Sequence, residues 1–226
     1  PDLGTILLLN KCDIESYVAG VVRAEGGTGK NIEYFKAQAV LVRTYLFKYY
    51  SKHSMDHFNL CDDTHCQVFN GITNDSIIIK ASQETEGQVI LGPDNLLIIS
   101  AFHSNCGGET ASSEDVWISP QQYLKKVTDP FCTSSRNARW ELIMTINQWK
   151  EYLKRSGAHE IPDNDELLNF SQPSRTDVYK AGDFTLPLKQ IRSDLKLRST
   201  FFSVFVSGDS VLFKGKGYGH GVGLCQ

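Results

Sequence analysis

Apolar residues recur at helical spacing in two neighbouring segments near the start of the chain. In residues 13–26, Tyr17, Val18, Val21 and Val22 fall on one face, which predicts an amphipathic helix. In residues 31–50, apolar residues again share one face, and Asn31 precedes them in the position of an N-cap. The pattern therefore predicts two consecutive helices.

The rest of the chain mixes strand-like and helix-like patterns. Strands are expected at residues 4–9, 68–71, 140–145 and within 186–197, with two more after residue 201. Helices are expected at 74–85 and 147–155, and a hairpin at 87–104 around a Gly-Pro-Asp-Asn turn. Residues 156–180 are polar and read as an insertion or exposed lobe. We expect one α+β domain over residues 1–226, with a mixed or antiparallel sheet.

Composition and charge exclude several classes of protein. The 226 residues are 41% hydrophobic and 22% charged, as in ordinary globular proteins. A net charge of −3 gives no electrostatic footprint for nucleic acid or an anionic membrane. No apolar run reaches the ~18 residues of a membrane span, so anchoring is expected only through segments outside this sequence. The chain starts at Pro1 and stops at Gln226, and we expect it to be trimmed at both ends.

Glu25 is the candidate catalytic residue between the two predicted helices. It follows an apolar run and precedes Gly26-Gly27, which would end the helix and let a ligand approach the backbone. Burial against an apolar helix end raises the pKa of a carboxyl, because it disfavours the charged form. A general acid near neutral pH needs such a pKa. The alternative is a solvated residue in the last helical turn.

A candidate metal site lies in residues 53–66, which are rich in histidine and cysteine. Thiolates and imidazoles are the ligands that tetrahedral zinc prefers. We expect zinc at Cys61, His65 and Cys66, with either His57 or His53 as fourth ligand. The alternative is a Cys61–Cys66 disulfide, or two buried thiols with exposed histidines. The spacing does not decide between these possibilities.

Two segments of the second half could also carry chemistry. Residues 101–117 hold His103, Ser104 and Cys106, which suit either a nucleophile–base pair or a loop contacting carbohydrate. Cys106 and Cys132 could pair in an oxidising compartment. Residues 215–226 alternate glycines around Tyr218 and His220, forming either a binding rim or a tight hairpin. This segment lacks the ending of a phosphate loop, and no organic cofactor is expected.

Six segments are informative as an ordered set, namely YVAGVVRAE, FKAQAVLVRTY, FNLCDDTHCQVFNG, FHSNCGGETASSEDVW, QQYLKKV and GKGYGHGVGLCQ. Taken together, they resemble the SpoIID family, which includes stage II sporulation protein D and the amidase-enhancer (LytB-type) proteins. The resemblance implies a peptidoglycan lytic transglycosylase, a lyase that cleaves the β-1,4 bond between N-acetylmuramic acid and N-acetylglucosamine without water. One essential carboxyl suffices, unlike in glycosidases with paired carboxylates. Sporulation itself is not implied.

The resemblance also assigns roles to single residues. It implies that Glu25 is the catalytic acid and base, and that Arg43 anchors substrate or tunes Glu25. It implies that Tyr123 and Lys125 contact the glycan, and that the zinc is structural. As further substrate contacts we predict the polar residues of the two glycine-rich segments, namely His103, Ser104, Tyr218 and His220.

The implied setting is extracytoplasmic wall remodelling. The expected partners are glycan strands, including strands stripped of stem peptides by a partner amidase. The alternative is a non-catalytic wall-binding module that stimulates an amidase. A zinc hydrolase is less favoured, because two thiolates and two imidazoles leave no position for water. The sequence departs from the family pattern at Gly26-Gly27-Thr28, at VWI and at Leu224-Cys225-Gln226, which bears on substrate preference.

Overall fold

The computed structural model describes residues 7–117, 119–161 and 164–226. These residues combine helices with antiparallel sheets, which confirms the predicted α+β class. Backbone contacts divide the chain into two compact units, residues 1–100 and residues 101–226. We call them unit 1 and unit 2.

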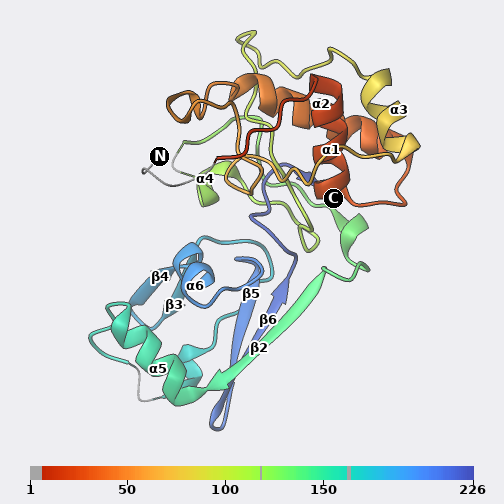
Figure 1. Ribbon diagram of the computed structural model, residues 1–226. Coiled ribbons are helices and arrows are strands. Elements are labelled where there is room, and N and C mark those ends of the chain that lie inside the picture. The colour runs from red at the N-terminus through yellow and green to blue at the C-terminus, as the bar shows by residue number, and fades with distance from the viewer. Residues whose placement is uncertain (1–6, 118, 162–163) are drawn as a thin grey trace. The chain divides into compact units, whose positions relative to one another are not determined.

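Unit 1 is built on helices in the residues that the structure describes (Figure 1). They are α1 (Ile14–Gly26), α2 (Ile32–Lys48), the 3₁₀ helix η1 (Ser54–Asp56) and α3 (Ser76–Glu84). Asp13, Asn31 and Asp75 cap the three α-helices, each accepting a backbone N–H of the first turn with its side chain. The structure therefore confirms the predicted helices and the Asn31 cap.

The three α-helices of unit 1 pack against one another in pairs through their apolar faces. The fully or nearly fully buried side chains on these faces are Val18, Val21, Val22, Phe35, Ala39, Val42, Ile78 and Ala81. Burying an aliphatic or aromatic side chain of this size stabilises a fold by about 1.5–3 kcal/mol. This small helical core fixes the C-terminal end of α1, where Glu25 lies.

Gly20, in the middle of α1, lets an extended segment cross the helix closely. A Cβ atom at this position would lie 2.4 Å from a ring carbon of Phe69 and 2.6 Å from the carbonyl oxygen of Gly71. The Phe69 ring also packs beside Tyr17, with centroids 5.2 Å apart. The segment was predicted as a strand at 68–71, but it forms no ladder, because its neighbour is a helix.

We expect Gly20→Ala to lower the free energy of unfolding, measured by urea denaturation, by about 1–3 kcal/mol through overpacking against Phe69 and Gly71. The gain of about 1 kcal/mol in helix propensity opposes this loss. Gly26→Ala is the matched control in the same helix, because its Cβ would meet only the end of the Tyr34 side chain, at 3.3 Å. Equal stabilities of the two variants would contradict the close crossing.

Two other strand predictions in unit 1 are not met. Residues 7–9 have no regular structure, and residues 4–6 lie outside the described residues. The hairpin expected at 87–104 is reduced to a tight turn with one isolated bridge, Leu91 to Leu97. The turn itself is present, since the Gly92 N–H donates to the carbonyl of Leu96 at 2.8 Å.

Unit 2 contains a three-stranded antiparallel sheet in the order β2-β6-β5 (Figure 1). The strands are β2 (Arg139–Thr145), β5 (Phe202–Ser207) and β6 (Ser210–Lys216), all of which the sequence predicts. A second antiparallel pair joins β3 (Val178–Ala181) to β4 (Phe184–Pro187). The predicted helix at 147–155 is α5 (Ile146–Arg155), which a Thr145–Gln148 capping box begins.

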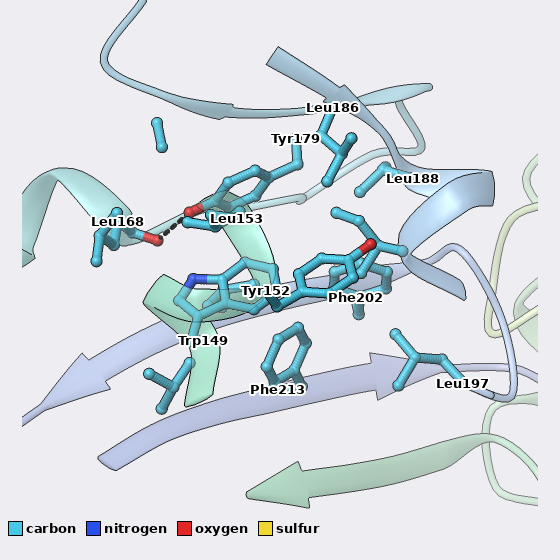
Figure 2. Packing of buried hydrophobic residues seen from close by; sticks show 14 of the residues in the cluster. Trp149, Tyr152, Leu153, Leu168, Tyr179, Leu186, Leu188, Leu197, Phe202 and Phe213 are labelled. Atoms are coloured by element: carbon cyan, nitrogen blue, oxygen red, sulfur yellow. Dashed lines mark hydrogen bonds between the residues drawn. The ribbon is translucent and has the colours of Figure 1, made fainter. Parts of the chain in front are cut away.

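Trp149 of α5 lies at the centre of the core of unit 2 (Figure 2). Its ring packs edge-on against Tyr179, at 5.4 Å between centroids, and against Phe213, at 5.1 Å. The buried hydroxyl of Tyr179 donates a hydrogen bond to the carbonyl of Leu168 at 2.9 Å (Figure 2). The buried Tyr179 hydroxyl therefore has a hydrogen-bond partner, whereas Nε1 of Trp149 is buried without one among the described residues.

This core corrects two expectations. Residues 156–180 are not an exposed lobe, because Ala158, Leu168 and Tyr179 are buried in it; residues 162–163 are outside the described part. Within 186–197, only the start is a strand. After β4 the chain forms α6 (Leu188–Asp194), because Leu188 and Ile191, one helical turn apart, both enter the core. A 3₁₀ helix, η3 (Asp165–Leu168), lies in the same region.

The remaining elements of unit 2 are short. They are β1 (Phe102–His103), α4 (Ser113–Val116), the 3₁₀ helix η2 (Pro130–Cys132) and β7 (Leu224–Cys225). β1 and β7 pair in parallel, with His103 opposite Cys225. Across both units, the described residues include no helix with the length and apolar character needed to cross a bilayer.

Candidate functional site

Glu25 lies in the last turn of α1, one residue before the helix ends. Gly27 follows as the C-cap with a φ of 74°, a backbone conformation that favours glycine. The Gly26-Gly27 pair therefore ends the helix as the sequence predicts. The Glu25 side chain is half-buried, which rules out the fully solvated alternative.

The surroundings of Glu25 favour its protonated form. Burial raises the pKa of the carboxyl, and one hydrogen bond, from the backbone N–H of Val68 to Oε1 at 2.9 Å, opposes this rise. The net effect leaves the pKa above the usual value for glutamate. Glu25 therefore has one oxygen fixed by the backbone and the other available for proton transfer.

Arg43, predicted to anchor substrate or to tune Glu25, is a fully buried residue of α2. Its side chain has no exposed surface and donates to Glu15 through Nε at 2.9 Å and Nη2 at 2.5 Å. It also donates to the carbonyl oxygens of Ser82 and Gln88, both at 3.1 Å. These contacts join α1, α2 and α3, so the guanidinium is unavailable to a glycan.

The metal site predicted in unit 1 is assembled from four donors. One ligand atom each from His53, Cys61, His65 and Cys66 lies within 4.8 Å of all the others. Nδ1 of His65 is 3.6 Å from the Cys61 sulfur and 4.0 Å from the Cys66 sulfur. Both thiols are free, so the disulfide alternative is not observed. Two imidazoles and two thiols match a tetrahedral zinc site.

The structure favours His53 over His57 as the fourth donor. Nδ1 of His53 lies 2.9 Å from a carboxylate oxygen of Asp56, and Nε2 is buried without a hydrogen-bond partner. Metal-bound histidines are commonly oriented by such a carboxylate. His57 is exposed and stands outside the cluster, at a residue with a φ of 67°.

The His/Cys cluster, defined as His53, Cys61, His65 and Cys66, is linked to Glu25 through the chain. Val68, which donates to Glu25, follows Cys66 by two residues. The intervening Gln67 is buried and accepts a hydrogen bond from the Tyr17 hydroxyl of α1 at 3.3 Å. Fixing the cluster therefore fixes the N–H that contacts the candidate catalytic carboxyl.

In unit 2, two of the predicted substrate contacts lie side by side. The rings of His103 and His220 are 5.7 Å apart, and Trp117 lies 5.6 Å from His220. Burial lowers the pKa of each histidine to about 4, so both imidazoles are neutral at pH 7. His103 is 4% exposed, its Nδ1 lies 3.0 Å from the carbonyl of Val222 in the glycine-rich segment, and its Nε2 is buried without a hydrogen-bond partner in the part of the chain that the structure describes.

The other predicted contacts of unit 2 have different exposures. The Ser104 hydroxyl accepts a hydrogen bond from Asn137 at 3.0 Å. The contacts of His103 and Ser104 are thus to other residues, and they do not form a nucleophile–base pair with each other. Tyr218 and Tyr123 are exposed, and the Tyr123 hydroxyl bonds to Gln121 at 3.0 Å. Lys125, also exposed, pairs with Glu114 at 2.6 Å.

Sequence reasoning missed three groups that the structure brings to these sites. They are the Val68 N–H on Glu25, the Asp56 carboxylate on His53 and the Glu15 carboxylate on Arg43. Asp56, three residues after His53, had a local signal in its spacing. The other two pairs join residues far apart in sequence and carry no local signal.

The fold and site define an α+β protein in which the half-buried carboxyl of Glu25 accepts a hydrogen bond from Val68, two residues after the His/Cys cluster. Residues 3–91 match the model of the SpoIID family, described as stage II sporulation protein. Stage II sporulation protein D of Bacillus subtilis is 28% identical over 94% of this chain and 66% of its own length. An uncharacterized protein of Brachyspira hyodysenteriae is 27% identical over 98% of this chain and 61% of its own.

A further relative is the amidase enhancer of Bacillus subtilis, 25% identical over 92% of this chain and 36% of its own length. This chain thus spans less than two thirds of the length of these relatives. The first part of the chain thus matches the SpoIID family model, and nearly the whole chain is similar to proteins named stage II sporulation protein D and amidase enhancer.

Proposed function

We propose that this protein remodels the bacterial cell wall as a peptidoglycan lytic transglycosylase, with Glu25 as its general acid and base. The observation that carries the proposal is the half-buried Glu25 with a raised pKa at the end of α1. A raised pKa favours the protonated carboxyl, which is the form that can donate a proton to a leaving oxygen. The similarity to the SpoIID family supports peptidoglycan as the substrate class of this proposal. Peptidoglycan lies outside the cytoplasmic membrane, so the proposed location is extracytoplasmic.

In the proposed reaction Glu25 moves one proton twice. It first donates to the glycosidic oxygen as the bond to C1 of N-acetylmuramic acid breaks. The 6-hydroxyl of the same sugar then attacks C1 and returns its proton to Glu25, leaving a 1,6-anhydro end and consuming no water. The Val68 N–H on Oε1 stabilises the carboxylate between the two transfers, while Oε2 carries the proton.

Glycan contacts are proposed for the accessible polar residues of unit 2. Tyr123, Lys125 and Tyr218 are exposed, and His220 and Ser104 are half-buried. Asn105, next to Ser104, forms a backbone bridge with Tyr218. Neutral imidazole, hydroxyl and ammonium groups are suitable partners for sugar hydroxyls. His103 is proposed as a positioning residue because it is buried.

We also propose that the His/Cys cluster holds a structural zinc ion. The unpartnered Nε2 of buried His53 and the two free thiols fit such an ion. Four protein ligands fill the tetrahedron, so the metal would stabilise the loop rather than activate water. The loop leads directly to Val68, and the ion would therefore hold Glu25 in its hydrogen bond.

The choice of His53 gives a direct test of this metal site. We expect His53→Ala to lower the zinc content of the purified protein by about one equivalent per chain, because the tetrahedral site loses a ligand. His57→Ala is the control and should retain full zinc content, since His57 lies outside the cluster. Inductively coupled plasma mass spectrometry measures both. Loss of zinc in His57→Ala alone would contradict the assignment.

A second candidate function is a non-catalytic module that stimulates a cell-wall amidase. The similarity to the Bacillus subtilis amidase enhancer favours it. Such a module would bind glycan strands and contact the amidase, and it would not depend on the proton-transfer role of Glu25.

Mass spectrometry of glycan strands incubated with the purified protein distinguishes these functions. Intact and peptide-stripped strands should both be tested. We expect products with 1,6-anhydro ends, as the proposed reaction requires. Products with reducing ends would overturn it in favour of hydrolysis. No cleavage by a folded protein, together with faster peptide release by an added amidase, would support the second candidate.

A further inference from the structure

A second group of metal-ligating side chains lies in unit 2, apart from the His/Cys cluster in sequence. It consists of Cys106, Asp129, Cys132 and Cys225, and one ligand atom of each lies within 4.8 Å of all the others. Cys106 is completely buried, and the other three residues are half-buried. We call these four residues the Cys₃Asp cluster.

All four donors lie within 4.8 Å of one another, and two of the distances between them are slightly shorter than the edges of a tetrahedral site. The sulfur atoms of Cys106 and Cys132 are 3.2 Å apart, and the Cys106 sulfur is 3.3 Å from Oδ2 of Asp129. With metal–sulfur bonds of about 2.3 Å, the edges of a ligand tetrahedron measure roughly 3.6–3.8 Å. A few tenths of an ångström of outward movement would therefore make room for an ion.

The surrounding backbone holds the donors in these positions. The N–H of Cys106 donates to the Cys225 sulfur at 3.3 Å, and the β1–β7 pairing fixes Cys225. Oδ1 of Asp129 accepts from the N–H of Phe131 at 3.3 Å, which turns Oδ2 toward Cys106. Such contacts around the donors are typical of preformed metal sites.

Asn105 ties the two cysteine-bearing loops together. Its side-chain amide donates to the carbonyl of Cys132 at 3.1 Å and to the Ser135 hydroxyl at 2.7 Å. Its side-chain oxygen accepts from the N–H of Gly107 at 2.7 Å. Gly107 itself packs on the backbone of residues 216–217, where a Cβ would come within 2.8 Å. The loops are therefore fixed independently of any bond between the sulfurs.

A Cys106–Cys132 disulfide explains only half of the cluster. The disulfide would use two of the three thiols. It would give no role to the Cys225 thiol or to the Asp129 carboxylate, which lie in the same cluster. Three thiolates and a carboxylate so close together repel one another unless they are protonated or bind a cation. The nearby Arg175 donates to the carbonyl of Cys106 at 2.8 Å and supplies only one positive charge.

We propose that Cys106, Asp129, Cys132 and Cys225 form a second, structural metal site that takes a thiophilic divalent ion such as Zn²⁺. Three sulfur ligands favour zinc over hard cations such as Mg²⁺ and Ca²⁺. The four ligands leave no open position, and the ion would link the loop after β1, the helix η2 and the strand β7. Binding releases the thiol protons to solvent.

Cobalt binding in a protein that lacks the first cluster tests this site. In the double variant Cys61→Ser, Cys66→Ser, titration with Co²⁺ should give about one equivalent bound, with thiolate-to-cobalt charge transfer and tetrahedral d–d bands. Adding Cys225→Ser should abolish the tight binding. Adding Cys12→Ser should not, because Cys12 belongs to neither cluster. Neither readout depends on glycan cleavage or on the proposed function.

Cys225→His distinguishes loss of a metal ligand from misfolding caused by any substitution at position 225, because histidine can also bind the metal. In the same background it should keep one bound ion and shift the charge-transfer band, because one sulfur ligand is lost. The proposal is overturned if the double variant binds no cobalt while its circular dichroism remains native. It is equally overturned if peptide mapping of protein purified without reductant shows Cys106 bonded to Cys132.

Discussion

Replacing Glu25 with glutamine is expected to reduce the rate of glycan cleavage by about 10²–10⁴-fold, the usual contribution of general acid–base catalysis. Glutamine keeps an oxygen that can accept the hydrogen bond from Val68 but cannot donate and recover a proton. The rate of formation of anhydro ends, followed by mass spectrometry, measures the effect. Glu86→Gln is the control, because Glu86 is an exposed carboxyl of the same unit.

The Glu25 substitution should not destabilise the protein at neutral pH. The pKa of Glu25 is raised in the folded state, so ionisation costs stability as pH rises from the unfolded pKa through the folded one. Glu25→Gln removes this cost. The melting temperature of the variant minus that of the wild type should therefore be larger at pH 7 than at pH 4. A variant that loses activity and also unfolds more easily at pH 7 would contradict the catalytic assignment.

Glu15→Gln is expected to lower the free energy of unfolding by about 3–5 kcal/mol, because it leaves the fully buried charge of Arg43 without its counter-ion. Glu33→Gln is the matched control. Glu33 pairs with Lys36 at 2.9 Å on the surface, and such pairs contribute at most about 1 kcal/mol. Urea denaturation at pH 7 compares the two, and similar effects would contradict the structural role of the buried pair.

The same ion pair gives a pH dependence of opposite sign to that of Glu25. Burial by itself would raise the pKa of Glu15, but hydrogen bonds from Arg43 and Ser82 and the Arg43 charge hold it below its ordinary value. Its stabilising contribution is therefore present above the unfolded pKa and is lost as pH falls through the folded one. The difference between wild type and Glu15→Gln should shrink in acid.

Local signals in the sequence were sufficient for α1, α2, α3 and α5 and for the main sheet. Asp13 and Asn31 are caps that act within one turn, and the apolar spacing of α5 reports directly on the face that it buries. The segment at 68–71 was mistaken for a strand, because extended backbone can pack on a helix at Gly20 without any ladder. Residues 156–180 are mostly polar, and Leu168 and Tyr179 pack into the core as isolated apolar residues without a periodic pattern that would predict it.

The candidate site was predictable in its chemistry but not in its geometry. Residue types and order indicated Glu25 and the His/Cys cluster, yet only tertiary contacts distinguish His53 from His57. The resemblance assigned Arg43 to anchor substrate or tune Glu25, and the sequence does not reveal that this charge lies buried between helices beside Glu15. Asp129 gave no signal, since its place beside Cys106 depends on how two loops meet.

The pairing of β1 with β7 affects how unit 2 forms during synthesis. It joins residues at the two ends of the unit, as the hydrogen bond between Cys106 and Cys225, 119 positions apart, illustrates. Contacts of such sequence separation slow folding, because a long loop must close before they stabilise anything. On the ribosome, at about 5–20 residues per second, β1 must wait several seconds for its partner. During that interval its edge is open, and a nascent chain would benefit from a chaperone that covers it.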